Sequence, residues 1–67
     1  MNTPREVERW VVEYLTNSGT AENRMKDIAD SLHCVCDHKE VEKAVERLLR
    51  RGVVAQYVMG YYQLRDT

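Results

Sequence analysis

Phenylalanine is absent from this chain of 67 residues, which has one tryptophan, one proline and three glycines. No apolar run is longer than three residues, as in Trp10-Val11-Val12, which excludes a membrane-spanning helix because that needs about 20 apolar residues. No apolar N-terminal segment resembles a signal peptide, so we expect a cytoplasmic location and no membrane partner.

The chain also lacks an excess of charge of either sign, since ten basic and eleven acidic residues give a net charge of -1. Any affinity for nucleic acid must come from a local basic face. Cys34 and Cys36 are too close in sequence for a disulfide between them to stabilise a fold. We therefore expect reduced thiols in a reducing compartment. The length predicts one domain over residues 1–67, stabilised by helix packing that dimerisation would supplement.

A first helix is expected from Thr3 to Asn17, because Thr3-Pro4-Arg5-Glu6 has the pattern of a capping box with proline at the first helical position. Gly19 suits the chain reversal that follows. Val12 lies roughly 100° from the centre of the apolar face, at the helical repeat of 3.6 residues per turn. It is either at the margin of the core or in contact with another chain. That apolar face comprises Val7, Trp10, Val11, Tyr14 and Leu15.

Two further helices and a hairpin are expected. Met25 is assigned to a short edge strand, and Lys26 to Leu32 to the second helix. Residues 37–40 repeat the capping-box pattern and open a third helix that ends at Gly52. Residues 53–64 predict a β-hairpin around Met59-Gly60, with Tyr62 and Leu64 packed on the third helix. The third helix has a buried stripe of Val41, Ala44, Val45, Leu48 and Leu49.

Basic side chains gather on the third helix opposite its apolar stripe, at Lys39, Lys43, Arg47 and Arg50. The alternative interpretation is a solvated face with intrahelical ion pairs, such as Glu46 with Arg50. Glu42 and Glu46 lie along one edge of the basic stripe. They would repel phosphates, although a carboxylate can accept a hydrogen bond from cytosine N4. They are equally compatible with a surface that binds a basic protein.

Potential metal ligands cluster between the second and third helices, at His33, Cys34, Cys36 and His38. The C-x-C spacing is tighter than that of zinc sites, and no second ligand pair occurs elsewhere. We favour one cysteine packed as a small apolar residue, with no metal and no cofactor. No nucleophile has an obvious base, and the domain is too small for a usual substrate cleft, so an enzyme is not expected.

Three segments together resemble the winged helix-turn-helix superfamily: Met25 to Leu32, Val41 to Val54, and Gly60-Tyr61-Tyr62-Gln63-Leu64. The likeness is closest to small single-domain prokaryotic regulators of phages and plasmids. It implies an α+β, mainly α fold with three helices and a short C-terminal β-hairpin wing.

For function, the resemblance implies a transcriptional regulator, often a homodimer, that binds double-stranded DNA through the third helix and touches the backbone with its wing. The alternative is a winged-helix adaptor that binds a protein partner and no DNA. The residues expected at DNA are Lys26, Lys39, Lys43, Arg47, Arg50, Tyr57 and Tyr61.

Overall fold

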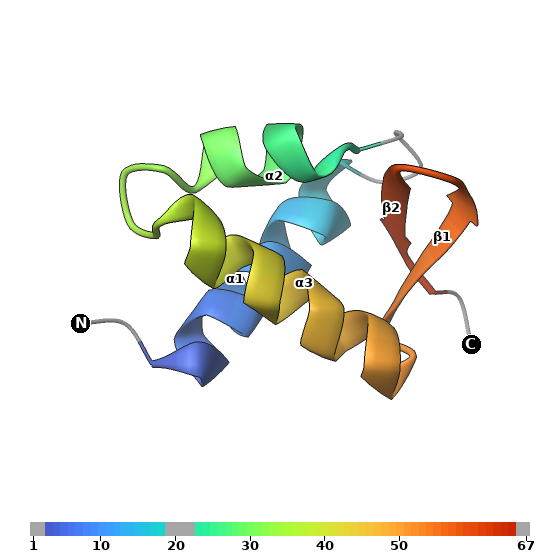
Figure 1. Ribbon diagram of the computed structural model, residues 1–67, viewed down its shortest axis with the longest axis horizontal. Helices are drawn as coiled ribbons and strands as arrows, with labels where there is room; N and C mark the ends of the chain where they lie inside the picture. Colours follow the sequence, from blue (N-terminus) through green and yellow to red (C-terminus); the bar gives the residue numbers. More distant parts are fainter. Residues whose placement is uncertain (1–2, 19–22, 66–67) are drawn as a thin grey trace.

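The computed structural model describes residues 3–18 and 23–65, without the side chain of Tyr57. Within these ranges three helices precede an antiparallel sheet, and most of the described residues are helical (Figure 1). This order confirms the predicted α+β fold with a winged-helix layout. The elements are α1 (Pro4–Ser18), α2 (Met25–Ser31), α3 (His38–Arg51), β1 (Val54–Val58) and β2 (Tyr61–Leu64).

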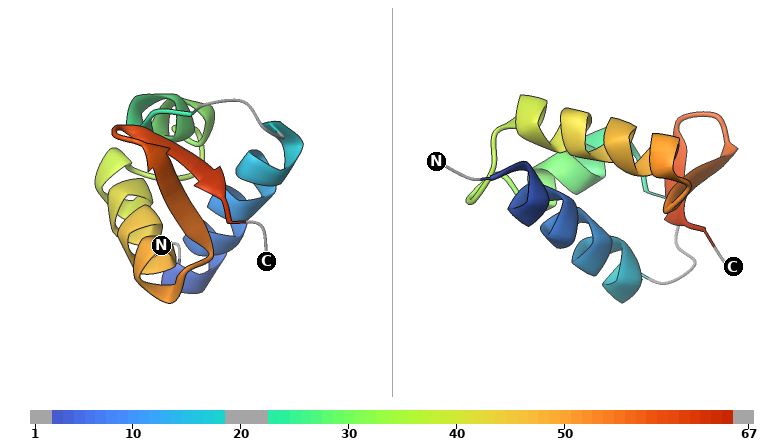
Figure 2. Two further views of the ribbon diagram at one scale, coloured as in Figure 1. Left: turned by 90° about the vertical axis from the view of Figure 1, so that its right-hand side faces the viewer. Right: turned by 90° about the horizontal axis from the view of Figure 1, so that it is seen from below.

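The hairpin lies at one end of the helices, beside the C-terminal end of α3 and the N-terminal end of α2 (Figures 1 and 2). Val54 pairs with Leu64 and Val58 with Tyr61, and the register shifts between these two pairs. Strand β1 adjoins α3, whereas β2 lies against α1. Tyr62 and Leu64 pack against the core, but the strand that carries them lies against α1, whereas the sequence predicted packing on the third helix.

The core lies where the three helices and β1 meet. Its buried apolar side chains are aliphatic apart from Cys36, the one buried residue of the turn between α2 and α3. Val12 is half-buried at the margin of this cluster. The buried residues are Val7, Val11, Leu15, Ile28, Ala29, Cys36, Val41, Ala44, Val45, Leu48 and Val54.

Local capping determines where the helices begin and end. At α1, Oγ1 of Thr3 accepts a hydrogen bond from the backbone N–H of Glu6 at 3.2 Å. At α3, Asp37 is the N-cap, and its backbone N–H donates to Oε1 of Glu40 at 3.1 Å. Gly52 ends α3 with a φ of 78°, a left-handed conformation that glycine adopts without steric cost. Gly19, expected beyond the end of the first helix, lies outside the described residues.

The short strand before α2 was predicted two residues too late. Met25 begins α2 rather than forming a strand, because Arg24 is already the extended N-cap and its N–H donates to Asp27 at 3.2 Å. The strand-like contact is made instead by Asn23, which forms an isolated antiparallel bridge with Tyr62. The helix also ends at Ser31, one residue before the predicted end, and Leu32 is its C-cap.

Asn23, just before α2, is linked by its hydrogen bonds to α1 and to β2. Its backbone carbonyl accepts from the N–H of Tyr62 at 2.7 Å. Its side-chain oxygen accepts from the hydroxyl of Tyr14 at 3.0 Å, and its amide nitrogen donates to Ser18 at 3.0 Å. Asn23 is buried, so these contacts satisfy polar atoms that would otherwise be costly to desolvate. They tie the end of α1 and the start of α2 to the wing.

Candidate nucleic-acid interface

The side of α3 that faces away from the core carries five exposed charged side chains. We call this set the α3 outer face: Lys39, Glu42, Lys43, Glu46 and Arg50. It is positioned by the burial of Val41, Val45 and Leu48 on the opposite side of the same helix. The predicted basic face is therefore accessible at three of its four positions.

The charges of the α3 outer face are segregated into rows rather than paired. Lys39 and Lys43 are one turn apart, and so are Glu42 and Glu46, so each row brings like charges together at the i,i+4 spacing. Among the described residues, Lys39, Lys43 and Arg50 make no ion pair with a carboxylate. The intrahelical pair Glu46–Arg50 of the alternative interpretation is thus not formed. Three cationic groups of the face stay available to another molecule.

Arg47, the fourth predicted residue, reaches toward α1, and its side chain is 38% exposed. Its Nε donates to Oε2 of Glu8 at 3.2 Å, while Nη1 of Arg51 donates to Oε1 of the same carboxylate at 2.8 Å. The side chain of Glu8 is only 13% exposed. We call these three residues the Glu8 clamp, because one carboxylate holds two arginines of α3 against α1. Sequence reasoning missed this role of Glu8.

Glu42 is partly occupied within its own helix. Its Oε1 lies 2.9 Å from Nε2 of His38, one turn earlier, and both side chains are about half exposed. When Nε2 carries a proton it donates to this carboxylate, and the contact becomes an ion pair when the imidazole is charged. Glu46 has no such neighbour among the described residues. Of the two carboxylates, Glu46 is therefore the more available to accept a hydrogen bond from another molecule.

The wing is fastened to the start of α2 through Tyr61. The guanidinium of Arg24 donates to the hydroxyl of Tyr61 through Nη2 at 2.8 Å and Nε at 3.3 Å, and it lies 5.2 Å from the ring centroid. This hydrogen bond raises the pKa of Arg24 further above its already high ordinary value. Lys26 is exposed in the first turn of α2, on the same stretch of chain. The side chain of Tyr57, the other tyrosine expected at DNA, lies outside the description.

The two cysteines between α2 and α3 have different environments. Cys36 is buried and Cys34 exposed, and both are free thiols, so one cysteine packs in the core as predicted. Burial raises the pKa of the Cys36 thiol, and the nearby carboxylates Glu40 and Asp37 raise it further. No cluster of three or more potential ligands for a metal ion occurs within residues 3–18 and 23–65.

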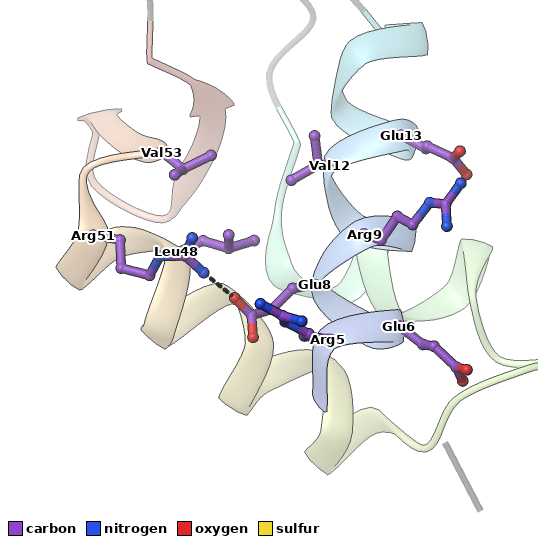
Figure 3. Close-up of a pocket in the computed structure, with 9 residues that line it drawn as sticks. All are labelled: Arg5, Glu6, Glu8, Arg9, Val12, Glu13, Leu48, Arg51 and Val53. Atoms are coloured by element: carbon purple, nitrogen blue, oxygen red, sulfur yellow. Dashed lines mark hydrogen bonds and ion pairs between the residues drawn. The ribbon is translucent and has the colours of Figure 1, made fainter. Parts of the chain in front are cut away.

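A shallow groove of about 560 Å³ runs between α1 and the end of α3 (Figure 3). Its apolar floor consists of Val12, Leu48 and Val53. Charged side chains from both helices border it, including Arg5 and Arg9 of α1 and the Glu8–Arg51 contact (Figure 3). The groove lies beside the Glu8 clamp, so it is separate from the α3 outer face.

Comparison with protein-family models, with curated proteins and with solved structures gave no match. None of the helices in the described part of the chain combines the length and apolar character that crossing a membrane requires. The structure brings Lys39, Lys43 and Arg50 together on one face. It places Lys26 on α2 and Tyr61 on the adjacent wing strand β2. Arg47 belongs to the Glu8 clamp.

Proposed function

We propose that this protein is a transcriptional regulator that binds double-stranded DNA with α3 as its recognition helix. One observation carries the proposal: Lys39, Lys43 and Arg50 are exposed and unpaired among the described residues, on the outer side of the second helix of a helix-turn-helix pair. In such domains this helix enters the major groove. The fold supplies the position, and the cationic groups supply the attraction to phosphate.

The dimensions of α3 suit this role. With 14 residues at a rise of 1.5 Å each it is about 21 Å long. A major groove roughly 12 Å wide admits a helix of this kind. Lys39 and Lys43 lie in its first half and would meet base edges or the groove rim, while Arg50 near its end would meet a phosphate. The hairpin beside that end of α3 would approach the backbone (Figure 2).

In this proposal Arg47 contributes to DNA binding indirectly, by holding α3 in place against α1. Its guanidinium is held by Glu8, so its contribution is to fix the angle between α3 and α1 rather than to contact DNA. Lys26, exposed at the start of α2, is the fourth cation available to a phosphate. The protein would therefore neutralise few phosphates. This agrees with its net charge of -1 and implies modest affinity for DNA of arbitrary sequence.

The salt dependence of binding tests the proposal. On a duplex of arbitrary sequence Lys39 and Lys43 would rest on phosphates at the groove rim, as Arg50 and Lys26 do. Four neutralised phosphates then give a slope of log K against log salt of about -3 to -4, so affinity should fall on the order of 100-fold between 50 and 200 mM salt. The assay is fluorescence anisotropy of a labelled 20-base-pair duplex. Replacing Lys39 and Lys43 with alanine should weaken binding and flatten the slope by about two. Arg5→Ala/Arg9→Ala removes the same charge from α1 and is the matched control, with little effect expected.

A second candidate function is an adaptor that binds a protein. The groove between α1 and α3 favours it, because its apolar floor of Val12, Leu48 and Val53 is bordered by charges of both signs. Met59 at the tip of the wing, 92% exposed, is a further apolar contact. Binding of a protein partner through this surface would respond to Val12→Asp and not to the loss of Lys39 and Lys43.

We also propose that the protein acts in the cytoplasm, as a homodimer on a two-fold site. Two free cysteines fit a reducing compartment. A second copy would extend the small number of phosphate contacts that one chain can make. Sedimentation equilibrium with and without duplex measures the stoichiometry, and a monomer throughout would refute the dimer.

A further inference from the structure

The exposed side chains of α3 belong to only a few chemical classes. The helix from His38 to Arg51 contains no asparagine, glutamine, serine or threonine. Every exposed residue in it is charged or is histidine. Ala44, its one small apolar residue, is fully buried in the core. The outer face therefore offers ammonium and guanidinium donors and carboxylate acceptors, and little else.

Base edges in the major groove distinguish among such groups. Asparagine and glutamine are the side chains that pair with adenine through N6 and N7, and small apolar groups contact the methyl of thymine. The α3 outer face has neither. Lysine and arginine donate to N7 and O6 of guanine, and glutamate accepts from N4 of cytosine. The groups present on α3 are thus the complement of a G·C pair.

The spacing of opposite charges on the helix matches the layout of that pair. Lys43 and Glu46 are three residues apart, which places them side by side on consecutive turns, and Lys39 and Glu42 repeat the arrangement one turn earlier. Across the major groove a G·C pair presents two acceptors and then one donor. An A·T pair presents a donor where guanine has O6 and an acceptor where cytosine has N4. Opposite an A·T pair, the lysine would therefore face another donor and the glutamate would face another acceptor.

We infer, on the premise of the proposed DNA-binding function, that the α3 outer face selects G·C base pairs in the major groove. Lys43 donates to guanine O6 and N7, and Glu46 accepts from N4 of the paired cytosine. Lys39 reads a second guanine in the same way. Glu46 is the better acceptor of the two glutamates because Glu42 already has His38 at 2.9 Å.

The carboxylates explain why this selectivity is strong for so few contacts. Each glutamate on the face repels phosphates whatever the sequence of the DNA. This loss of binding free energy is offset only where the glutamate accepts a hydrogen bond from a cytosine amino group. Segregated rows of like charge add a small cost in the free helix, at Lys39–Lys43 and at Glu42–Glu46. Both costs are relieved when the donors and acceptors of the groove occupy the face.

The first test compares two pools of 20-base-pair duplexes by anisotropy, at low salt and again at higher salt. One pool has random G·C sequence and the other has random A·T sequence. We expect at least ten-fold tighter binding to the G·C pool. Equal binding to both pools, still weakened by salt, would overturn G·C selection and leave the DNA-binding function standing. Binding to neither pool at any salt would refute the DNA-binding function itself.

Modified bases then locate the contacts. Replacing guanine with 7-deazaguanine removes the N7 acceptor and should weaken binding to the G·C pool several-fold. Replacing guanine with inosine leaves the major-groove edge intact and removes only the minor-groove amino group, so affinity should be retained. The reverse result would place the reading in the minor groove and overturn the assignment to α3.

The variant Glu46→Gln separates base recognition from repulsion. An amide repels phosphates less and pairs with adenine, so affinity for the A·T pool should rise and the preference for G·C should fall several-fold. Equal strengthening of both pools, with the preference unchanged, would mean that Glu46 acts only by repulsion and would overturn its contact with cytosine. Glu13→Gln on α1 makes the same charge change away from α3 and should leave the preference unaltered.

Discussion

The Glu8 clamp offers the sharpest test of how α3 is held. Glu8→Gln keeps the size of the side chain and removes the charge that Arg47 and Arg51 share. The side chains of Glu8 and Arg47 are 13% and 38% exposed, between the surface and the buried extremes. Exposed ion pairs contribute about 0.2–1 kcal/mol, and removing one partner of a fully buried pair costs about 3–5 kcal/mol. We therefore expect Glu8→Gln to lower the free energy of unfolding by about 1–2 kcal/mol.

The measurement is urea unfolding followed by circular dichroism, with the midpoint of thermal unfolding as a second readout. A loss of 1 kcal/mol should lower that midpoint by about 4–8 °C in a domain of this size. Arg47→Met should cost more than Arg51→Met, because Arg51 is 66% exposed and its contact is better screened by solvent. Stability unchanged in Glu8→Gln, or a larger cost at Arg51 than at Arg47, would refute the clamp.

Three further predictions concern stability. Gly52→Ala should cost about 1–2 kcal/mol in urea unfolding, since φ is 78° there and alanine is strained in that conformation; no loss would contradict the αL cap. Asn23→Ala should cost about 1–3 kcal/mol, because it leaves the hydroxyl of Tyr14 without its acceptor, and Asn23→Ala in a Tyr14→Phe background should cost less. The raised pKa of Cys36 means that its protonated thiol stabilises the fold fully below the ordinary pKa of 9.0, and this contribution is lost as pH rises through the folded pKa. Cys36→Ser should flatten the decline of unfolding free energy in that alkaline range, and an identical pH profile would contradict the assignment.

The ends of the helices were predictable because their causes are local. The caps at Thr3, at Asp37 and at Gly52 are set by residues within four positions of each other. The start of α2 was missed because Met25 alone does not distinguish a strand from a helix. The distinguishing interaction is that of Arg24 with Asp27, whose capping pattern lacks the usual small polar N-cap.

The candidate site was predictable only where one helix determines it. Periodicity places Lys39, Lys43 and Arg50 on one side of α3, and the structure has them exposed there. The role of Arg47 depends on how α1 crosses α3, since its partner Glu8 is 39 positions away. Contacts of that sequence separation have no periodic signal within either helix. The hydrogen bond between Arg24 and Tyr61 likewise required the register of the hairpin.

DNA binding through α3 is tested most directly by an amide-resolved NMR titration of the labelled protein with a G·C-rich duplex, at low salt and again at higher salt. We expect shifts concentrated on residues 39–50 and on the hairpin, which fade as salt rises and are lost in Lys39→Ala/Lys43→Ala while the fold is retained. Shifts confined to the groove of Val12, Leu48 and Val53, or no shifts at either salt concentration, would contradict DNA binding by this face.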